Sequence, residues 1–222
     1  MTLMSVKTVP YEMVRERLSS SILSDVLDGM GFRHQAMREG IRPLYPGSVV
    51  VGRAHTMLMA DVYEPEEDTF ALQIEGIDRL RKDDVMVVAS NRSTEAALWG
   101  ELLSTAAKCR GARGAVIDGL ARDLRQMEEM KFPVFAAGAR PISSKGRCIA
   151  IDYGCRINCG GVNVELGDLV FGDVDGIVVV PEVVIEEAVK GGMERVSSER
   201  VTKKELVAGS LLKQVYDKYG TL

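Results

Sequence analysis

The stretch "WGELLSTAAKCRGARGAVIDGLARD", residues 99–123, predicts a helix, a strand and the start of a second helix in close succession. A helix is expected to begin at Gly100, and its apolar positions would form one stripe: Leu102, Leu103, Ala106 and Ala107. Its polar positions would lie on other faces: Glu101, Ser104, Thr105 and Lys108. The apolar GAVIDG, residues 114–119, is typical of a buried strand, and a second helix is expected from Ala121 to Met130.

The same alternation extends to both sides of this stretch. A strand is expected at Pro133–Gly138, and two earlier ones at Gly47–Ala60 and Asp83–Ser90. The acidic residues Glu64–Asp68 favour the start of a helix that continues through residue 82. Strands that alternate with helices predict an α/β fold with a partly parallel, mixed central sheet flanked by helices.

The two ends of the chain have a different pattern. Residues 10–30 have helical spacing and predict two short helices or one broken helix. Short apolar runs between Gly146 and Pro181 alternate with Gly-Asp turns, which predicts a β-meander or a small barrel. A helical C-terminal tail is expected from Pro181, with a break at Gly191-Gly192. No linker composition divides the chain, so we expect one domain over residues 1–222.

Composition narrows the choice of partners. The chain has 222 residues, 46% of them hydrophobic, and a formal net charge of −4. Scattered basic residues and this acidity argue against nucleic acid as a partner. The sequence shows neither a secretory signal nor a membrane-spanning run, so we expect a cytoplasmic protein with no membrane contact. Its four cysteines form no C-x-x-C pair, and we expect reduced thiols. A redox or soft-metal cluster among the three cysteines within residues 148–159 is the alternative.

Three charged residues of the opening stretch are candidates for chemistry. Glu101 lies at a helix N-terminus, where the amides of Leu102 and Leu103 could hold a substrate carboxylate and Gly100 would allow close approach. Arg122 offers a planar fork for a carboxylate, and Asp123 offers a hard oxygen ligand. The alternative is purely structural: Glu101 favours the helix dipole, and Arg122-Asp123 form an exposed local ion pair.

At these residues the sequence resembles the RraA-like family, which includes class II 4-hydroxy-4-methyl-2-oxoglutarate/4-carboxy-4-hydroxy-2-oxoadipate aldolases and regulators of ribonuclease E activity. The resemblance covers nearly the whole chain, and its aldolase signature is an acidic residue, twenty residues, then Arg-Asp. Here these are Glu101 and Arg122-Asp123. The other shared blocks are SDVLDGMG (24–31), IRPLYPGSVVVGRAHT (41–56) and GDVDGIVVVP (172–181).

The resemblance implies a swivelling β/β/α-type domain that assembles as a trimer or a dimer of trimers, with active sites between subunits. It implies Mg²⁺ or Mn²⁺ bound directly by Asp123 and through water by Glu101, while Arg122 contacts the substrate. A glutamate from a neighbouring subunit's C-terminal helix also approaches the metal waters in the aldolases, and here its counterpart is Glu199. Two departures stand out: Glu101 replaces the usual Asp, and SNRST at residues 90–94 replaces Asp-Gly-Gly-Gly-Asp.

The implied reaction is cleavage of a 4-hydroxy-2-oxo acid to pyruvate by a metal that polarises the C2 carbonyl, with oxaloacetate decarboxylation as a side activity. Arg122 would stabilise developing negative charge, and Glu101 or Glu199 would help to take the proton from the C4 hydroxyl. The alternatives are a Schiff-base aldolase that uses Lys108, Lys131 or Lys145, and a methyltransferase, which CGGVNVELGD at residues 159–168 fits badly. A non-catalytic regulator that binds a ribonuclease or another partner protein is the alternative from another class.

Overall fold

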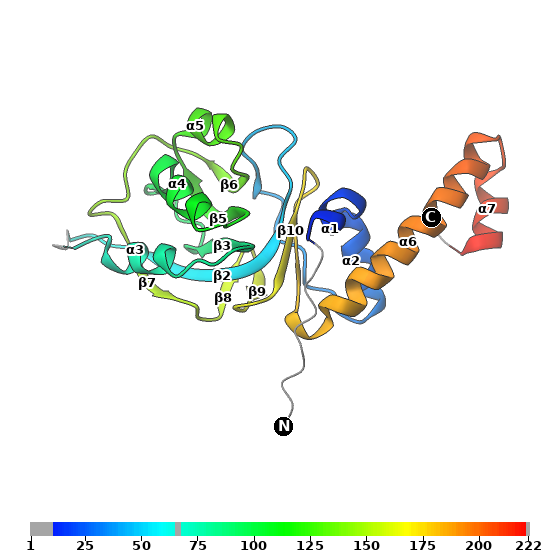
Figure 1. Ribbon diagram of the computed structural model, residues 1–222, viewed down its shortest axis with the longest axis horizontal. Coiled ribbons are helices and arrows are strands. Elements are labelled where there is room, and N and C mark those ends of the chain that lie inside the picture. The colour runs from blue at the N-terminus through cyan, green and yellow to red at the C-terminus, as the bar shows by residue number, and fades with distance from the viewer. Residues whose placement is uncertain (1–10, 65–67, 221–222) are drawn as a thin grey trace, which may run out of the picture.

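A mixed, twisted sheet forms the centre of the computed structural model, which describes residues 11–64 and 68–220 (Figure 1). Its helices are α1 (Tyr11–Arg17), α2 (Ser20–Gly29), α3 (Ala71–Asp78), α4 (Glu101–Cys109), α5 (Leu124–Glu129), α6 (Ile185–Val207) and α7 (Leu212–Tyr219), with a 3₁₀ turn at Glu182–Val184. Its strands are β1 (Arg42–Pro43), β2 (Val50–Asp61), β3 (Asp84–Ala89), β4 (Ala97–Trp99), β5 (Gly114–Ala121), β6 (Val134–Ala139), β7 (Cys148–Tyr153), β8 (Ile157–Cys159), β9 (Val162–Val164), β10 (Leu169–Gly172) and β11 (Ile177–Val180).

The strands follow the order β1-β6-β5-β3-β2-β10-β11 across the sheet. β2, β3, β5 and β6 are parallel neighbours, β4 adds a short parallel pairing to β5, and β1, β7, β10 and β11 pair antiparallel. The predicted α/β fold with a mixed sheet is therefore confirmed. Because the carboxyl ends of β3 and β5 meet at one edge, the loops that follow them lie together there.

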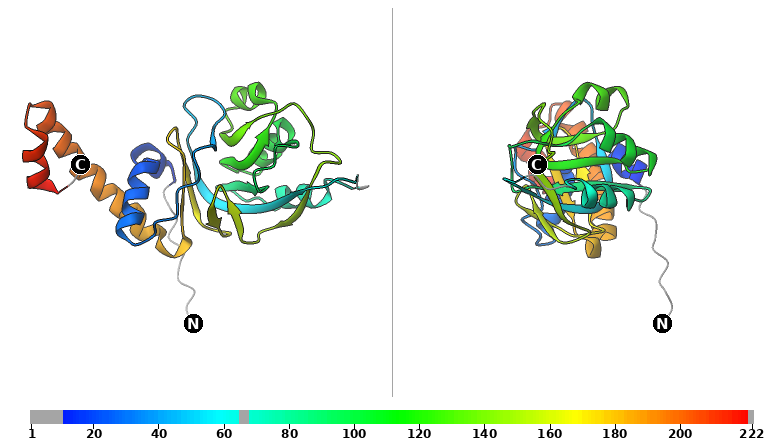
Figure 2. Two further views of the ribbon diagram at one scale, coloured as in Figure 1. Left: turned by 180° about the vertical axis from the view of Figure 1, so that it is seen from behind. Right: turned by 90° about the vertical axis from the view of Figure 1, so that its left-hand side faces the viewer.

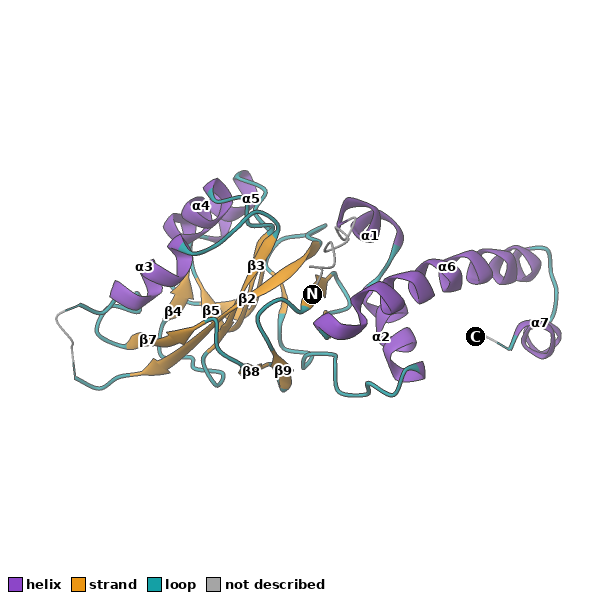
Figure 3. Cartoon of the chain, turned by 60° about the horizontal axis from the view of Figure 1, so that its bottom comes forward, coloured by secondary structure: helices purple, strands orange, loops and turns teal. Residues whose placement is uncertain are grey.

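Both faces of the parallel strands are covered. Met86 and Val88 of β3 pack into a core under α3, α4 and α5, whereas Val85 and Val87 pack into a second core against the β8–β9 hairpin. Figure 3 shows the three helices on one face of the sheet and this hairpin on the other. Successive residues of a strand point to opposite faces, so burial on both faces accounts for the apolar run VMVVA that follows Asp84.

The N-terminal and C-terminal helices lie beyond the β10–β11 edge of the sheet. α1, α2 and the first part of α6 bury a third core against Leu169, Phe171 and Val178. α6 then continues away from the rest of the molecule and ends in α7, as Figure 1 and the left view of Figure 2 both show. We call residues 1–184 the body and residues 185–222 the arm, and we describe each only over its described part. Among the described residues of both the body and the arm, no helix is long and apolar enough to cross a lipid bilayer.

Four local predictions are wrong. The predicted break at Gly191-Gly192 is absent, because these glycines allow α6 to approach Val26 and Leu18 closely. The predicted meander is instead split between β7 on β2, a separate β8–β9 hairpin, and β10–β11 at the sheet edge. The second helix starts at Leu124, not at Ala121, because β5 continues through Ala121.

The fourth error concerns the apolar stripe of α4. Leu102 is 80% exposed and Ser104 is fully buried, so the helix is rotated from the predicted orientation. The expected two short N-terminal helices are confirmed, with the Ser19 hydroxyl capping α2. Part of the acidic stretch before α3 lies outside the described residues, and α3 itself begins at Ala71.

Candidate active site

The only tryptophan of the chain holds the first turn of α4 in place. Trp99 ends β4 and is 1% exposed, and its indole Nε1 donates a hydrogen bond of 2.7 Å to the Ser104 hydroxyl. A buried indole N–H needs an acceptor, and the buried Ser104 supplies it. The amides of Leu102 and Leu103 lie in this first turn, where N–H groups have no acceptor within the helix.

Asp123 reaches the same place from the end of β5. Its backbone is left-handed, with φ 61° and ψ 39°, a conformation that Asp tolerates better than most residues. Its carboxylate Oδ2 accepts the Glu101 amide at 3.2 Å and lies 3.6 Å from Arg122 Nε. The Arg122 amide donates to the Trp99 carbonyl at 2.9 Å. The strained turn therefore directs the Asp123 carboxylate at the N-terminus of α4.

Gly100 makes this approach sterically possible. A Cβ at position 100 would lie 2.6 Å from Asp123 Oδ2 and 3.1 Å from Arg122 Cγ. No side chain fits there unless the acid or the arginine moves. The requirement for glycine is thus a matter of space at the carboxylate, since the backbone of Gly100 is extended and open to any residue.

A cavity of about 390 Å³ opens over these groups. Gly100, Glu101, Leu102, Leu103, Arg122 and Asp123, the six site residues predicted within the opening stretch, all line it. The side chains of Arg122 and Asp123 are 40% and 35% exposed, so both can meet a ligand. The structure brings together every predicted site residue of one chain except Glu199.

Glu199 lies on the arm, in a different part of the molecule. Its Oε1 accepts the Arg195 Nε of the same helix at 3.0 Å, and Arg195 also reaches Asp25 of α2. α6 and α4 lie on opposite sides of β10 in Figure 1. Glu199 was assigned to a neighbouring subunit's site, and that assignment stays a prediction.

The residues present fit a hard, largely hydrated cation. Mg²⁺ in proteins often takes only one or two carboxylates and keeps several waters. Among the described residues there is no cluster of three or more potential metal-ligating side chains, so a site at Asp123 depends on water for its remaining ligands. Oδ2 of Asp123 is held by an N–H, and no hydrogen bond to Oδ1 is found in the described part of the chain. The missing side chain at Gly100 lets the Asp123 carboxylate lie against the start of α4.

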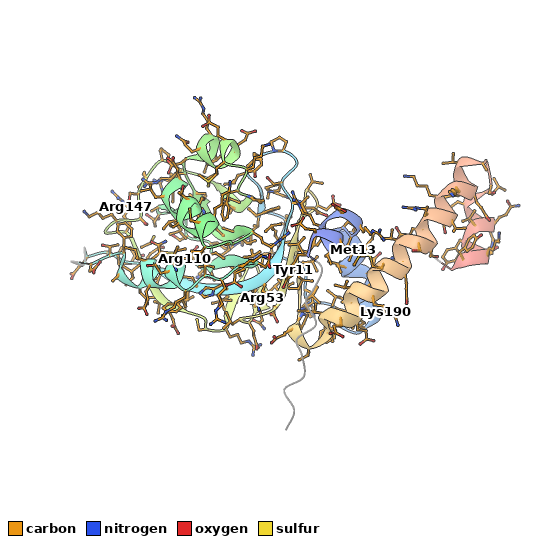
Figure 4. All side chains as sticks on the ribbon, in the orientation of Figure 1. Tyr11, Met13, Arg53, Arg110, Arg147 and Lys190 are labelled. Carbon is orange, nitrogen blue, oxygen red and sulfur yellow. The ribbon has the colours of Figure 1, made fainter. Side chains whose placement is uncertain are left out.

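The lysines of the Schiff-base alternative lie elsewhere. Lys108 donates to the Met130 carbonyl, and Lys131 lines a separate cavity with Arg113 at the opposite edge of the sheet. Lys145 is exposed and lines neither that cavity nor the one at Asp123. Figure 4 draws the side chains of the described residues on the ribbon and labels Arg110 and Arg147 among them.

The cysteines have separate surroundings. Cys148 donates from Sγ to Asp61 Oδ1 at 3.0 Å, and its burial raises the pKa of this thiol to about 12. Burial also raises the pKa of Cys159 well above its ordinary value. Cys109 is exposed, and all four thiols are free. None of them lines the cavity at Asp123.

The loop after β3 carries the SNRST sequence. Asn91 and Arg92 are both left-handed, with φ 52° and 64°, a conformation that glycine adopts more easily. Ser90 donates from its amide and its hydroxyl to Oδ1 of the buried Asp118, which fixes the start of the loop. Arg140 Nη1 donates to the Thr94 carbonyl and fixes its end.

Sequence reasoning missed one wall of the cavity. Phe70, the residue before α3, and Ile74 of α3 line it, and Ser143 and Ser144 line it from the loop before β7. Phe70 and Ile74 are four residues apart and share a helix face, a signal present in TFALQIEG. What the sequence lacked was any indication that this face meets α4.

A family model described as Aldolase/RraA (RraA-like) matches residues 20–179. The chain belongs to this family of α/β proteins. Among its curated relatives is a protein of Halalkalibacterium halodurans named "Putative 4-hydroxy-4-methyl-2-oxoglutarate aldolase", 30% identical over 86% of this chain and 88% of its own length.

Two further comparisons show the range of the family. Protein DlpA of Legionella pneumophila is 30% identical over 90% of this chain, which spans only 32% of that relative's length. The crystal structure of RraAS2 from Streptomyces coelicolor, described as an unusual member of the RNase ES inhibitor RraA protein family, superposes with a TM-score of 0.79 at 27% identity. It covers 88% of this chain and 96% of its own. The fold is therefore the RraA fold, and the family's names include both aldolases and inhibitors.

Proposed function

We propose that this protein is a divalent-metal-dependent lyase that cleaves a 4-hydroxy-2-oxo acid and releases pyruvate. The observation that carries the proposal is the convergence of Asp123, Arg122 and the N-terminus of α4 in one open cavity. The relative named as an aldolase supports the same class of reaction.

Asp123 would hold Mg²⁺ or Mn²⁺ directly, and Glu101 would hold it through water. When bound, the cation supplies Lewis acidity at the substrate's C2 carbonyl. The free amides of Leu102 and Leu103 would bind the C1 carboxylate, because helix N-termini favour anions. Arg122, whose side chain is 40% exposed in the same cavity, could then contact the substrate.

Proton and charge movements then fall to the side chains. Loss of the C4 hydroxyl proton, accepted by Glu101 or by a water that it holds, lets C4 become a carbonyl as the C3–C4 bond breaks. The electron pair moves toward C3 and the C2 oxygen, where the Arg122 guanidinium stabilises the developing negative charge. Protonation at C3 completes pyruvate. Oxaloacetate would lose CO₂ at the same site, because the same electron sink serves both bonds.

We propose in addition that the protein assembles as a trimer or a dimer of trimers in the cytoplasm. Glu199 does not line the cavity at Asp123, and α6 extends away from α4 (Figure 1), so we assign this carboxylate to the site of a second copy. Glu199 would then assist Glu101 with the proton at the C4 hydroxyl. If a neighbouring chain supplies this second carboxylate, the active site is complete only in the assembled oligomer.

The second candidate is a non-catalytic regulator that docks on a ribonuclease or another protein. It is favoured by the RraAS2 structure, whose description places that protein among RNase ES inhibitors. Such a role needs a surface and does not need the charges at Arg122 and Asp123.

Pyruvate release decides between the two candidates. We expect oxaloacetate and 4-hydroxy-4-methyl-2-oxoglutarate to yield pyruvate with Mg²⁺ or Mn²⁺, followed by coupled reduction to lactate. A chelator should abolish the release, and added metal should restore it. Release that persists in excess chelator would contradict the metal-dependent mechanism, and absence of release with every metal and substrate would favour the regulator.

A further inference from the structure

The cavity at Asp123 continues into a largely apolar wall. Its apolar side chains come from α3, β4 and the first turn of α4: Phe70, Ile74, Leu98, Trp99, Leu102 and Leu103. Ile74 and Leu102 are 54% and 80% exposed, although large aliphatic side chains on a surface are costly when nothing covers them. The wall therefore offers apolar contact area next to the groups that would bind a 2-oxo acid.

The polar groups of this wall are already engaged or small. Gln73 is 2% exposed, and its amide Nε2 donates to the Leu98 carbonyl at 3.1 Å. The Ser143 hydroxyl accepts the Lys145 amide at 3.2 Å. Neither side chain carries a charge, so neither can form an ion pair with a ligand. Hydrogen bonding along the wall is thus mostly satisfied within the protein.

The charges are the decisive feature. Among the described lining residues the only cation is Arg122, beside the two acids Glu101 and Asp123. Arg140 lines the adjoining cavity with Arg122, and its Nη1 donates to the carbonyls of Thr94 and Glu95. On the wall that this chain supplies, a second carboxylate at C4 of the substrate would lie against apolar side chains without a cationic partner, and such burial is unfavourable.

From this geometry we infer, on the basis of the proposed lyase function, that the preferred substrate is a monocarboxylic 4-hydroxy-2-oxo acid with an apolar substituent at C4. The aliphatic or aromatic substituent packs on Ile74, Leu102 and Leu103. Cleavage breaks C3–C4, the C4 hydroxyl loses its proton, and C4 leaves as an apolar aldehyde. The electron pair stays on C3, which takes up a proton to give pyruvate. No oxidant or further reactant is needed.

Ligand binding tests the inference without turnover. Trp99 is the single tryptophan and lines the cavity, so its fluorescence reports on occupancy. The probes are 4-methyl-2-oxopentanoate and 2-oxoglutarate, 2-oxo acids without a 4-hydroxyl group that differ in the end of the chain. We expect the apolar acid to bind at least about tenfold more tightly, as burial of a few methyl groups would give. Equal affinity, or tighter binding of 2-oxoglutarate, would overturn the inference.

Cleavage provides the second test. We expect kcat/KM for 4-hydroxy-2-oxoheptanoate to exceed that for 4-hydroxy-4-methyl-2-oxoglutarate by about tenfold or more. Ile74→Arg places a guanidinium on the wall at an exposed helix position, and it should shift this ratio toward the dicarboxylic acid. The matched control is Val174→Arg, at a 74% exposed valine in the β10–β11 turn, which should leave the ratio unchanged.

Each remaining outcome has one interpretation. If Ile74→Arg leaves the substrate ratio at the wild-type value, the wall does not select the substituent and the inference is wrong. If Ile74→Arg changes the molar mass in light scattering while Val174→Arg does not, the wall is a contact between subunits, which also overturns it. If no substrate yields pyruvate, the proposed function fails, and the Trp99 titration still decides what the wall binds.

Discussion

The body and the arm of this protein are held together in different ways. The body buries three apolar clusters around its sheet, and its site residues project from strand ends fixed by that core. Beyond the contact with α2, the arm buries little and leaves a series of apolar side chains exposed: Val201, Val207, Leu211, Leu212 and Tyr216. Ion pairs join residues within its helices, and Lys218 with Glu205 joins α7 to α6.

This difference separates two kinds of functional residue. Asp123 and Arg122 are positioned by one chain, so their arrangement can be read from the body alone. Glu199 is held by Arg195 of its own helix and does not line the cavity at Asp123, so its proposed role depends on a second copy. The arm would then gain from assembly the apolar burial that the body obtains by folding.

The largest expected effect comes from Asp123→Asn in the body. Asn tolerates the left-handed backbone, so the fold should persist while the charge that would hold the metal is lost. We expect pyruvate release to fall by about 100- to 1000-fold with little change in melting temperature. The matched change in the arm, Asp217→Asn, removes a carboxylate paired with Lys213 and should retain activity. An active Asp123→Asn protein would remove the basis for the metal site.

Glu199→Gln tests whether the arm contributes chemistry. We expect a loss of about 100-fold in kcat if the carboxylate takes part in proton transfer. Glu194→Gln is the control on the same helix, since Glu194 is exposed and pairs with Lys190.

Mixed assemblies distinguish a role in the neighbouring site from a structural role. When Asp123→Asn and Glu199→Gln chains are co-expressed, a site that takes one residue from each of two chains is intact in about a quarter of cases. We expect activity to recover to about that fraction of wild type. No recovery in isolated mixed assemblies would place Glu199 outside the neighbouring site and leave catalysis to the body.

Gly100→Ala should have an intermediate effect. The added Cβ would meet Asp123 Oδ2 at 2.6 Å, so the carboxylate must move from its position beside the Glu101 amide. We expect kcat/KM to fall by about tenfold, since small displacements of catalytic groups are costly. Gly29→Ala is the control, because nothing lies within 4 Å of a Cβ there. Full activity of Gly100→Ala would show that the Asp123 carboxylate can move aside without loss of catalysis.

These variants also show what could be predicted from the sequence. The order of strands and helices follows from apolar periodicity, which is local, and the approach of Glu101 to Asp123 follows from the rule that parallel strands present their loops at one edge. The left-handed backbone of Asp123 and the rotation of α4 do not follow from periodicity. They depend on contacts between segments, such as Gly100 against Asp123 and Trp99 against Ser104.

Ser104 is the clearest example of a residue whose position depends on contacts between segments. Its position in α4 predicted a face pointing away from the core, whereas the structure buries it completely because the indole N–H of Trp99 needs an acceptor. The apolar wall formed by Phe70 and Ile74 was missed for a similar reason. A helical stripe indicates that a helix packs, and the partner it packs against is set by the rest of the chain.

The smallest effect on activity and a clear effect on stability are expected for Ser104→Ala. Removal of the hydroxyl leaves the Trp99 indole N–H buried without its acceptor, which should lower the free energy of unfolding by about 1–3 kcal/mol. Urea unfolding followed by Trp99 fluorescence measures it, and Thr105→Ala, at the exposed neighbouring position, is the control. Because α4 begins three residues before Ser104, a loosened anchor should raise KM more than it lowers kcat. Stability equal to that of wild type would mean that the indole finds another acceptor, and the first turn of α4 would then be held by the Asp123 contact alone.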